Sequence, residues 1–387
     1  MRYFIQYPAG TGKLVADAVS NFVEDFSVRY QDDSAMLFDS ASSTQRVAQL
    51  PFAKNAFVVL ADTPRKDVDQ SALRLVDRLG RTDFSAFPVR TSGFRVMVHV
   101  DGELASVAPG VRSGLERAVS AATGGRVEAR GSCQEFWLIG RLDLRDLMFC
   151  ARLPKQKRAK KARGAVSHEL SSMLVLAARP EGDDVFLDPF GGSGSFALAR
   201  AELPARQIVY SDLDLAIHRK ELPEELTRHE RVRLLSEDAL ELPSISDGSV
   251  DTVVTDPPWG EHEELPIPYP AFARAVADSL ARVLDPVTGR LVLLCARRGA
   301  DDYRRSLETA GFALDATHDV LVNGHPATVF VGSRRTDAAP SPVATSAAKT
   351  KTDAPDTAPG RRRPHDPGKP LLRGMSTQRR SLGRFSR

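Results

Sequence analysis

The chain has 387 residues, at least twice the usual size of one domain, so we expect more than one hydrophobic core. Hydrophobic residues make up 42% and charged residues 27%, which excludes a collagen-like or wholly disordered chain. No apolar run is long enough to span a membrane, and the N-terminus lacks the apolar core of a signal peptide. The three cysteines are too far apart in sequence for a disulfide framework or a closed zinc site. We therefore expect a cytoplasmic protein, a monomer with no metal and no membrane partner.

Residues 1–150 have the patterns of a small α+β region. Phe94–Val100 alternates apolar and polar residues before an Asp-Gly turn, which predicts a strand. A helix is expected at Val111–Ala122 and a further strand at Glu135–Ile139. Strand and helix patterns also mix near the N-terminus, at Tyr3–Tyr7, Lys13–Phe26 and Ala56–Leu60. No catalytic constellation occurs in this half.

A basic run at residues 152–163 separates the two halves of the chain. It holds seven basic residues and no acidic one. Runs of one charge are usually solvated, but a position between two folded segments favours contact with nucleic-acid phosphates. The candidate RNA-binding residues are Lys155, Lys157, Arg158, Lys160 and Lys161.

Residues 167–332 alternate between strand and helix patterns. A helix is expected at Ala271–Leu284, with apolar side chains on one face and ion-pairing residues on the other. Two final strands, Phe312–Val322 and His325–Gly332, flank an Asn-Gly turn that predicts a hairpin. The other expected strands are Val185–Leu187, Gln207–Ser211, Arg231–Leu235, Asp251–Thr255 and Leu291–Cys295. This order predicts an α/β fold with a doubly wound, mostly parallel sheet that ends in an antiparallel hairpin.

The C-terminal tail differs from the rest of the chain. Residues 336–387 hold 11 Lys+Arg and 4 Asp+Glu, a net charge of +7, whereas residues 1–335 sum to −4. The tail is rich in Pro, Ala, Ser and Thr and has few large apolar residues. Such a segment cannot bury enough surface to offset the entropy of ordering, so we expect a disordered basic tail.

The strand at Val185–Leu187 runs into a glycine-rich turn, Asp188-Pro-Phe-Gly-Gly-Ser-Gly194. Glycines at the carboxyl end of a strand let a ligand approach the backbone without meeting a Cβ atom. The turn is not the G-x-G-x-x-G of dinucleotide sites. It is not the G-x-S-x-G elbow of hydrolases either, because Ser195 holds the last glycine position.

Acidic residues also follow the next two strands. Asp212 comes after Gln207–Ser211, 24 residues beyond Asp188, where a carboxylate can accept the hydroxyl hydrogens of a ribose. Asp238 comes after Arg231–Leu235, where it can accept a hydrogen from an adenine amino group. Any one of these acids could be a helix N-cap. Three acidic residues, each after the end of a predicted strand, favour ligand binding over three separate caps.

The motif Asp256-Pro257-Pro258-Trp259 follows the strand Asp251–Thr255. Two prolines make an extended, rigid turn and remove two backbone donors. The Asp256 carboxylate and nearby carbonyl oxygens are then acceptors, and Trp259 offers a flat stacking surface. Acceptors beside a stacking ring predict a site for a planar base with an exocyclic amino group.

The two motifs together resemble those of S-adenosylmethionine-dependent amino-methyltransferases. A resemblance to the THUMP-domain RNA methyltransferases, which methylate guanine N2, covers most of residues 1–335. The Ser85–Leu142 segment resembles the THUMP domain, and Gly164–Leu170 resembles the family's lead-in helix. The sequence departs from many relatives at Gly191, where Cys is common, and at Trp259, where Tyr or Phe is commoner.

This resemblance implies a division of the chain and a set of site residues. The segments are a ferredoxin-like segment (1–62), a THUMP-like RNA-binding domain (63–150), a basic linker (151–166), a Rossmann-like methyltransferase domain (167–335) and the tail (336–387). The implied cofactor is S-adenosyl-L-methionine. Its implied binding residues are Asp188, Pro189, Phe190, Gly191, Gly192, Ser193, Gly194, Asp212, Leu213, Asp238 and Ala239. The implied catalytic residues are Asp256, Pro257, Pro258 and Trp259.

The sequence therefore predicts an RNA guanine-N2 methyltransferase that acts on tRNA, with rRNA as another substrate to test. One alternative is an adenine-N6 nucleic-acid methyltransferase, because Asp-Pro-Pro-Trp also occurs in that class. Another is a non-catalytic RNA-binding protein with a vestigial methyltransferase fold.

Overall fold

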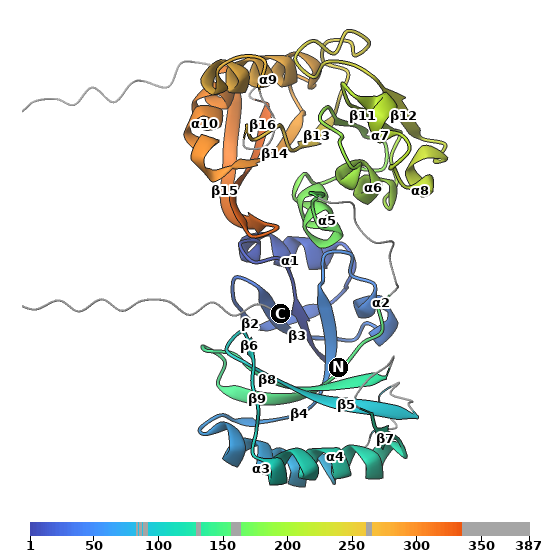
Figure 1. The fold of residues 1–387 in the computed structure, drawn as a ribbon, viewed down its shortest axis with the longest axis vertical. Coiled ribbons are helices and arrows are strands. Elements are labelled where there is room, and N and C mark those ends of the chain that lie inside the picture. The colour runs from blue at the N-terminus through green and yellow to red at the C-terminus, as the bar shows by residue number, and fades with distance from the viewer. Residues whose placement is uncertain are drawn as a thin grey trace, which may run out of the picture. The chain divides into compact units, whose positions relative to one another are not determined.

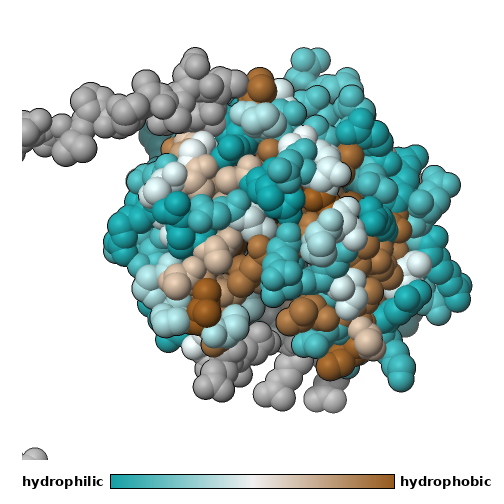
Figure 2. Space-filling model, turned by 90° about the horizontal axis from the view of Figure 1, so that it is seen from above, coloured by the Kyte–Doolittle hydropathy of each residue, from teal (hydrophilic) through white to brown (hydrophobic). Residues whose placement is uncertain are grey.

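The computed structural model describes residues 1–82, 84, 87, 92–128, 133–155, 164–260 and 265–334. The tail lies outside these residues, and so do four of the five candidate RNA-binding residues, all except Lys155. No helix among the described residues is long and apolar enough to cross a membrane. Seen from above, the surface is mostly hydrophilic, with hydrophobic side chains showing between the polar ones (Figure 2).

The first half of the chain forms a nine-stranded sheet (Figure 1). The strand order is β2-β3-β1-β4-β9-β8-β5-β6, and β7 pairs with β5. The central strand β4 runs from Asn55 to Pro64 and so crosses residue 62, where one predicted segment ends and the next begins. The strands are β1 (Arg2–Gln6), β2 (Phe26–Gln31), β3 (Ala35–Ser40), β4 (Asn55–Pro64), β5 (Gly93–Val100), β6 (Glu103–Leu104), β7 (Arg126–Val127), β8 (Gln134–Gly140) and β9 (Asp146–Arg152).

Four helices accompany this sheet, namely α1 (Gly12–Ser20), α2 (Thr44–Ala48), α3 (Val68–Leu79) and α4 (Pro109–Thr123). In α4, Leu115 and Val119 are fully buried in the core that these helices make with the sheet. The helical pattern at Lys13–Phe26 is shorter than predicted. The helix ends at Ser20, because Asp25 has a positive φ of 47° and Phe26 already begins β2.

The second half forms a seven-stranded mixed sheet in the order β12-β11-β10-β13-β14-β16-β15. The first five strands of that order are parallel to one another. β16 runs antiparallel to β14 on one side and to β15 on the other. The prediction of a mostly parallel sheet ending in a hairpin is confirmed. The strands are β10 (Val185–Asp188), β11 (Gln207–Ser211), β12 (Val232–Leu235), β13 (Thr252–Thr255), β14 (Arg290–Ala296), β15 (Phe312–Val322) and β16 (His325–Arg334).

The hairpin turn has the geometry that its residues predict. Asn323 and Gly324 both have positive φ, 53° and 90°, as a two-residue type I′ turn requires. The strand that pairs with β14 is β16, not β15, which follows β14 in the sequence. The last strand of the hairpin therefore lies between β14 and β15. Sequence order alone would not place the last strand inside the sheet.

Helices cover both faces of this sheet. On one face, α5 and α6 pack on an apolar cluster that includes Leu174, Phe196 and Val254, and this set of residues is called the α5 cluster below. On the other face, α9 and α10 pack on a second cluster. The helices are α5 (His168–Ala177), α6 (Ser195–Ala201), α7 (Leu215–His218), α8 (Glu224–Thr227), α9 (Tyr269–Val283) and α10 (Ala300–Thr309), with the 3-10 helix η2 (Arg297–Gly299). Two helical layers around a mixed sheet confirm the predicted α/β architecture.

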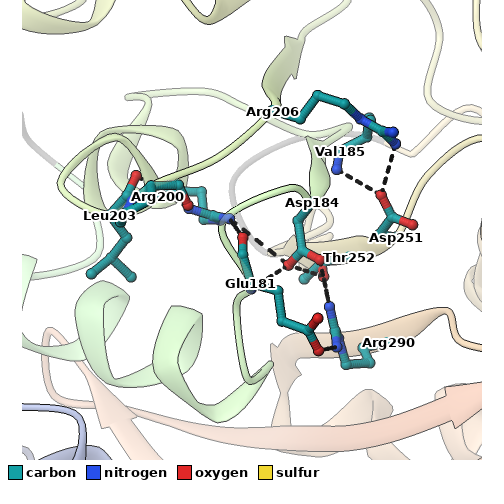
Figure 3. A network of polar contacts seen from close by, with 10 residues as sticks. Glu181, Asp184, Val185, Arg200, Leu203, Arg206, Asp251, Thr252 and Arg290 are labelled. Atoms are coloured by element: carbon teal, nitrogen blue, oxygen red, sulfur yellow. Dashed lines mark hydrogen bonds and ion pairs between the residues drawn. The ribbon is translucent and has the colours of Figure 1, made fainter.

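A network of arginines and carboxylates closes the amino edge of this sheet (Figure 3). Asp184, just before β10, accepts hydrogen bonds from Arg290 Nη2 at 2.6 Å and from Thr252 Oγ1 at 3.1 Å. Arg200 lies 3.8 Å from the same carboxylate and donates to the carbonyl oxygens of Pro204 at 2.6 Å and Glu181 at 2.7 Å. The buried Asp184 carboxylate is thus paired with two arginines and one hydroxyl group.

Candidate active site

The strand order brings four acidic residues to the carboxyl edge of the second sheet. β10 lies between β11 and β13, so Asp188 at its end has Asp212 on one side and Asp256 on the other. Asp238 follows β12, one strand further out. The chain order reverses between β10 and β13, and ligands of open α/β sheets bind at such a switch point. The predicted cofactor and catalytic residues therefore share one edge.

The glycine-rich turn connects β10 to α6 and is tied to the next strand. Gly192 and Gly194 have positive φ of 45° and 75°, which side chains rarely adopt. The Gly192 backbone N–H donates to Asp212 Oδ2 at 2.7 Å. A Cβ at Gly191 would lie 2.2 Å from the Tyr210 ring, which fills the space that Cys would need. Tyr210, which sequence reasoning missed, thus accounts for the departure at Gly191.

The side chains of the turn have different surroundings. Phe190 is partly buried and packs on Phe272, with ring centroids 6.1 Å apart. Pro189 is buried. Ser193 Oγ lies 2.8 Å from Ser195 Oγ. The predicted contacts of this turn with a cofactor stay predictions.

The candidate ribose and adenine residues lie in tight turns after β11 and β12. Asp212 Oδ1 accepts a hydrogen bond from the Asp214 N–H at 2.9 Å, so this carboxylate also shapes its own turn. Leu213 beside it is 66% exposed, an apolar side chain with no protein cover. Asp238 is exposed and accepts from the Leu240 N–H at 2.9 Å, while Ala239 is buried.

Asp188 and Asp256 form a pair of coupled acids. Asp188 is fully buried, and the Thr255 hydroxyl donates to its Oδ1 at 3.4 Å. Its Oδ2 has no partner among the described residues. Burial raises the pKa of Asp188 well above its usual range, and the nearby Asp256 charge raises it further. Burial also raises the pKa of Asp256 to about 7.

The Asp-Pro-Pro-Trp turn is held by two side-chain hydrogen bonds. The Trp259 indole Nε1–H donates to Asp256 Oδ1 at 2.7 Å. Arg298 Nη2, from η2 at the end of β14, donates to the Trp259 carbonyl oxygen at 2.9 Å. No donor among the described residues bonds to Asp256 Oδ2 or to the Pro257 carbonyl. The described residues thus leave both acceptors unengaged, and Pro258 adds rigidity to the turn.

Sequence reasoning missed Thr255 and Arg298 as well as Tyr210. The signal for Arg298 was present, because it follows the predicted strand at Leu291–Cys295 and strand ends of one parallel sheet meet at one edge. Thr255 carried no such signal, since a threonine at a strand end is ordinary.

The candidate RNA-binding residue Lys155 has protein partners in this structure. Its ammonium group donates to Glu169 Oε1 at 2.6 Å and to the Ala53 carbonyl at 2.7 Å, so its charge is paired with α5. Its contact with RNA stays a prediction. Lys157, Arg158, Lys160 and Lys161 lie outside the described residues, and their role stays a prediction.

The described residues include one group of carboxylates close enough to hold a cation, Glu181, Asp183 and Asp184. This group lies at the amino edge, and Arg290 pairs with both Glu181 and Asp184. Carboxylates that arginine already neutralises are poor cation ligands. The predicted absence of a metal centre stays a prediction.

The second sheet, with four acidic residues at its carboxyl edge, resembles the sheet of known methyltransferases. Residues 155–220 match the UPF0020 family, described as an RMKL-like methyltransferase domain. No curated protein matches the chain significantly by sequence.

Similar solved structures extend over both sheets. TrmN from Thermus thermophilus is 21% identical with a TM-score of 0.67, covering 86% of this chain and 99% of that chain. A predicted N6-adenine-specific DNA methylase from Listeria monocytogenes is 13% identical with a TM-score of 0.59, covering 86% and 95%. SMU.472, assigned as a methyltransferase and complexed with SAH, is 12% identical with a TM-score of 0.58, covering 86% and 98%. At these identities the similarity establishes the fold.

Proposed function

We propose that this protein is an S-adenosylmethionine-dependent RNA methyltransferase that methylates the exocyclic N2 of a guanosine in tRNA. The observation that carries the proposal is the pair of free acceptors at the carboxyl edge, Asp256 Oδ2 and the Pro257 carbonyl oxygen. Two such acceptors on consecutive residues match an amino group, which has two hydrogens to donate. The matching family model and the structure of SMU.472 with SAH support S-adenosylmethionine as the methyl donor.

The residues present fit S-adenosylmethionine. The buried Asp188 Oδ2 without a protein partner is an acceptor for a cationic ligand, and Leu213 offers an uncovered apolar surface to an adenine ring. Asp212 would hold the ribose hydroxyls, and Asp238 the adenine amino group. When bound, the cofactor supplies an electrophilic methyl group on a positively charged sulfur.

Asp256 has two tasks in this reaction. The lone pair of the guanine amino group is delocalised into the ring, so the nitrogen is a weak nucleophile. Hydrogen bonds from its two hydrogens to Asp256 Oδ2 and the Pro257 carbonyl draw the lone pair back onto nitrogen. The nitrogen loses one proton when it gains the methyl group, and the ionised Asp256 carboxylate is positioned to accept it. Catalysis then rests on positioning and on preorganised charge.

The first sheet and the linker would hold the RNA. The sequence resemblance to a THUMP-domain protein supports this assignment, with shape and phosphate contacts as the mode of binding. The target base must leave its stack to reach the edge between β10 and β13, with Trp259 as the stacking surface. We propose a cytoplasmic monomer, as the sequence predicts.

One alternative has a specific observation in its favour. The structure from Listeria monocytogenes is described as an N6-adenine-specific DNA methylase, and adenine also carries an exocyclic amino group. The two acceptors do not distinguish these bases. The intact set of four acids at the carboxyl edge argues against a non-catalytic protein.

The decisive experiment is nucleoside mass spectrometry. Purified protein is incubated with isotopically labelled S-adenosylmethionine and, separately, with tRNA, rRNA and DNA from cells that lack the gene. We expect labelled N2-methylguanosine in tRNA. Labelled N6-methyladenine would establish the alternative, and cofactor binding without labelled nucleoside in any substrate would overturn the proposal.

A further inference from the structure

The chain has only two tryptophans, and each donates its indole N–H to a carboxylate. Trp137 Nε1 bonds to Glu135 Oε2 at 3.0 Å within the first sheet, where Arg152 also pairs with Glu135 at 2.8 Å. Trp259 Nε1 bonds to Asp256 Oδ1 at 2.7 Å, and no arginine or lysine among the described residues pairs with Asp256. Within the described part of the chain, the indole is therefore the sole side-chain donor to the carboxylate at the candidate active site.

The protein holds this donor in place before any substrate binds. The Trp259 ring packs against the α5 cluster, which fixes its plane. Its backbone carbonyl accepts the hydrogen bond from Arg298 at 2.9 Å, so the neighbouring strand β14 anchors the turn from the other side. With Pro257 and Pro258 between donor and acceptor, the indole N–H has little freedom to leave the carboxylate.

This bond has two consequences for Asp256. It fixes the orientation of the carboxylate through Oδ1 and leaves Oδ2, which no described residue engages, for a substrate amino group. It also stabilises the ionised carboxylate, because a hydrogen bond to a charged acceptor is stronger than one to a neutral acceptor. A phenylalanine ring, which could also stack on a base, has no donor and can do neither.

We propose that Trp259 is a positioning residue whose indole N–H orients the Asp256 carboxylate and keeps it ionised for methyl transfer, in addition to any stacking. This inference rests on the proposed amino-group methylation. It assigns to the tryptophan in Asp-Pro-Pro-Trp a task that a phenylalanine in its place would not perform.

Four other titratable groups of the described residues lie near Asp256 and bear on the pH profile of methyl transfer. Cys295 on β14, Tyr269 on α9 and Tyr303 on α10 all have pKa values raised by burial, that of Cys295 to about 12. These three groups stay neutral from pH 5 to pH 9. Asp188 on β10 has a raised pKa and titrates together with Asp256, so the two carboxyl groups must be separated by substitution.

The first test is the pH profile of single-turnover methyl transfer at saturating RNA and cofactor. In W259F we expect the acidic limb to move to higher pH by about one unit, with much of the rate recovered at alkaline pH. W137F, which loses the equivalent indole bond away from the site, should keep the wild-type midpoint. An unmoved midpoint in W259F, or a loss equal at every pH, would overturn the proposal.

A second variant covers the case in which W259F does not fold. Site-specific replacement of Trp259 by 3-benzothienylalanine exchanges the indole N–H for sulfur and keeps the ring size. The proposal requires the same shift of the acidic limb in this variant. A wild-type profile would leave stacking as the only role of the ring.

A third test does not depend on activity. Urea unfolding should show that W259F is destabilised more at pH 8.5 than at pH 6, because the lost bond is to the ionised carboxylate. This pH dependence should vanish when W259F is made in a D256N background, and its persistence there would overturn the proposal. If the stability result holds but no RNA is methylated, the carboxylate–indole bond stands and the proposed function fails.

Discussion

The amino and carboxyl edges of the second sheet hold carboxylates in opposite electrostatic situations. Asp184, at the amino edge, is 4% exposed and is surrounded by Arg290, Arg200 and Thr252 (Figure 3). Asp188, four residues further along the chain at the other end of β10, is fully buried with no cationic partner among the described residues. The same residue type thus stabilises the fold at one edge and is left for a ligand at the other.

This difference separates structural from functional acids. A buried carboxylate that arginines neutralise is satisfied and adds little chemistry. A buried carboxylate with a raised pKa and an unpaired oxygen is destabilising by itself, and such groups cluster at functional sites. The contrast between the edges predicts which substitutions damage folding and which damage activity.

The largest expected effect is on stability at the amino edge. Asp184→Ala leaves Arg290 and Arg200 without their shared carboxylate, so we expect a loss of about 3–5 kcal/mol in the free energy of unfolding, measured by urea denaturation. Asp278→Ala is the control, because it belongs to an exposed ion pair with Arg274 on α9, outside this network. A loss in Asp184→Ala no larger than in the control would contradict the structural role of the network.

At the carboxyl edge, substitution should reduce activity instead. Asp256→Ala removes an acceptor for the substrate amino group, so we expect methyl transfer to fall by roughly 10²-fold to 10³-fold. Cofactor affinity, measured by calorimetry, should stay near the wild-type value, whereas Asp212→Ala should weaken it. Wild-type turnover in Asp256→Ala would remove this carboxylate from the reaction.

The free energy of unfolding should also depend on pH through Asp256 at the carboxyl edge. The pKa of Asp256 is about 7 in the folded protein, above its value in the unfolded chain, so the folded state holds an extra proton between about pH 4 and pH 7. The stability that this proton contributes is lost as the pH rises through that window, by at most about 1.4 kcal/mol per pH unit. In Asp256→Asn this part of the slope should be absent. Equal slopes in both proteins would place the pKa of Asp256 outside the window.

The smallest expected effect concerns the paired and unpaired charges of the linker. Lys155→Ala should lower stability by less than about 1 kcal/mol and leave the salt dependence of RNA binding unchanged, because Glu169 already neutralises this lysine. Changing Lys157, Arg158, Lys160 and Lys161 together to Ala should flatten the salt dependence. A flattened slope in Lys155→Ala alone would show that the ion pair opens on the RNA.

Local patterns in the sequence determined the elements of the second sheet. Each of its five predicted parallel strands occurs within one residue of the predicted ends, and the Asn323-Gly324 hairpin turn is present. Periodicity and turn chemistry act between neighbours in the chain, so a sequence reveals them directly. The rule that acids at parallel strand ends meet at one edge also followed from the sequence.

The tertiary structure alone decided which groups are paired. Nothing near Lys155 in the sequence points to Glu169 as its partner, and nothing in Asp-Pro-Pro-Trp shows that the indole would bond to the carboxylate instead of turning away. Strand order placed Asp188 beside Asp256, and the insertion of β16 beside β14 completed the sheet. Such partners are chosen by long-range packing and by the free energy of leaving a buried charge unpaired, which have no periodic signature in the chain.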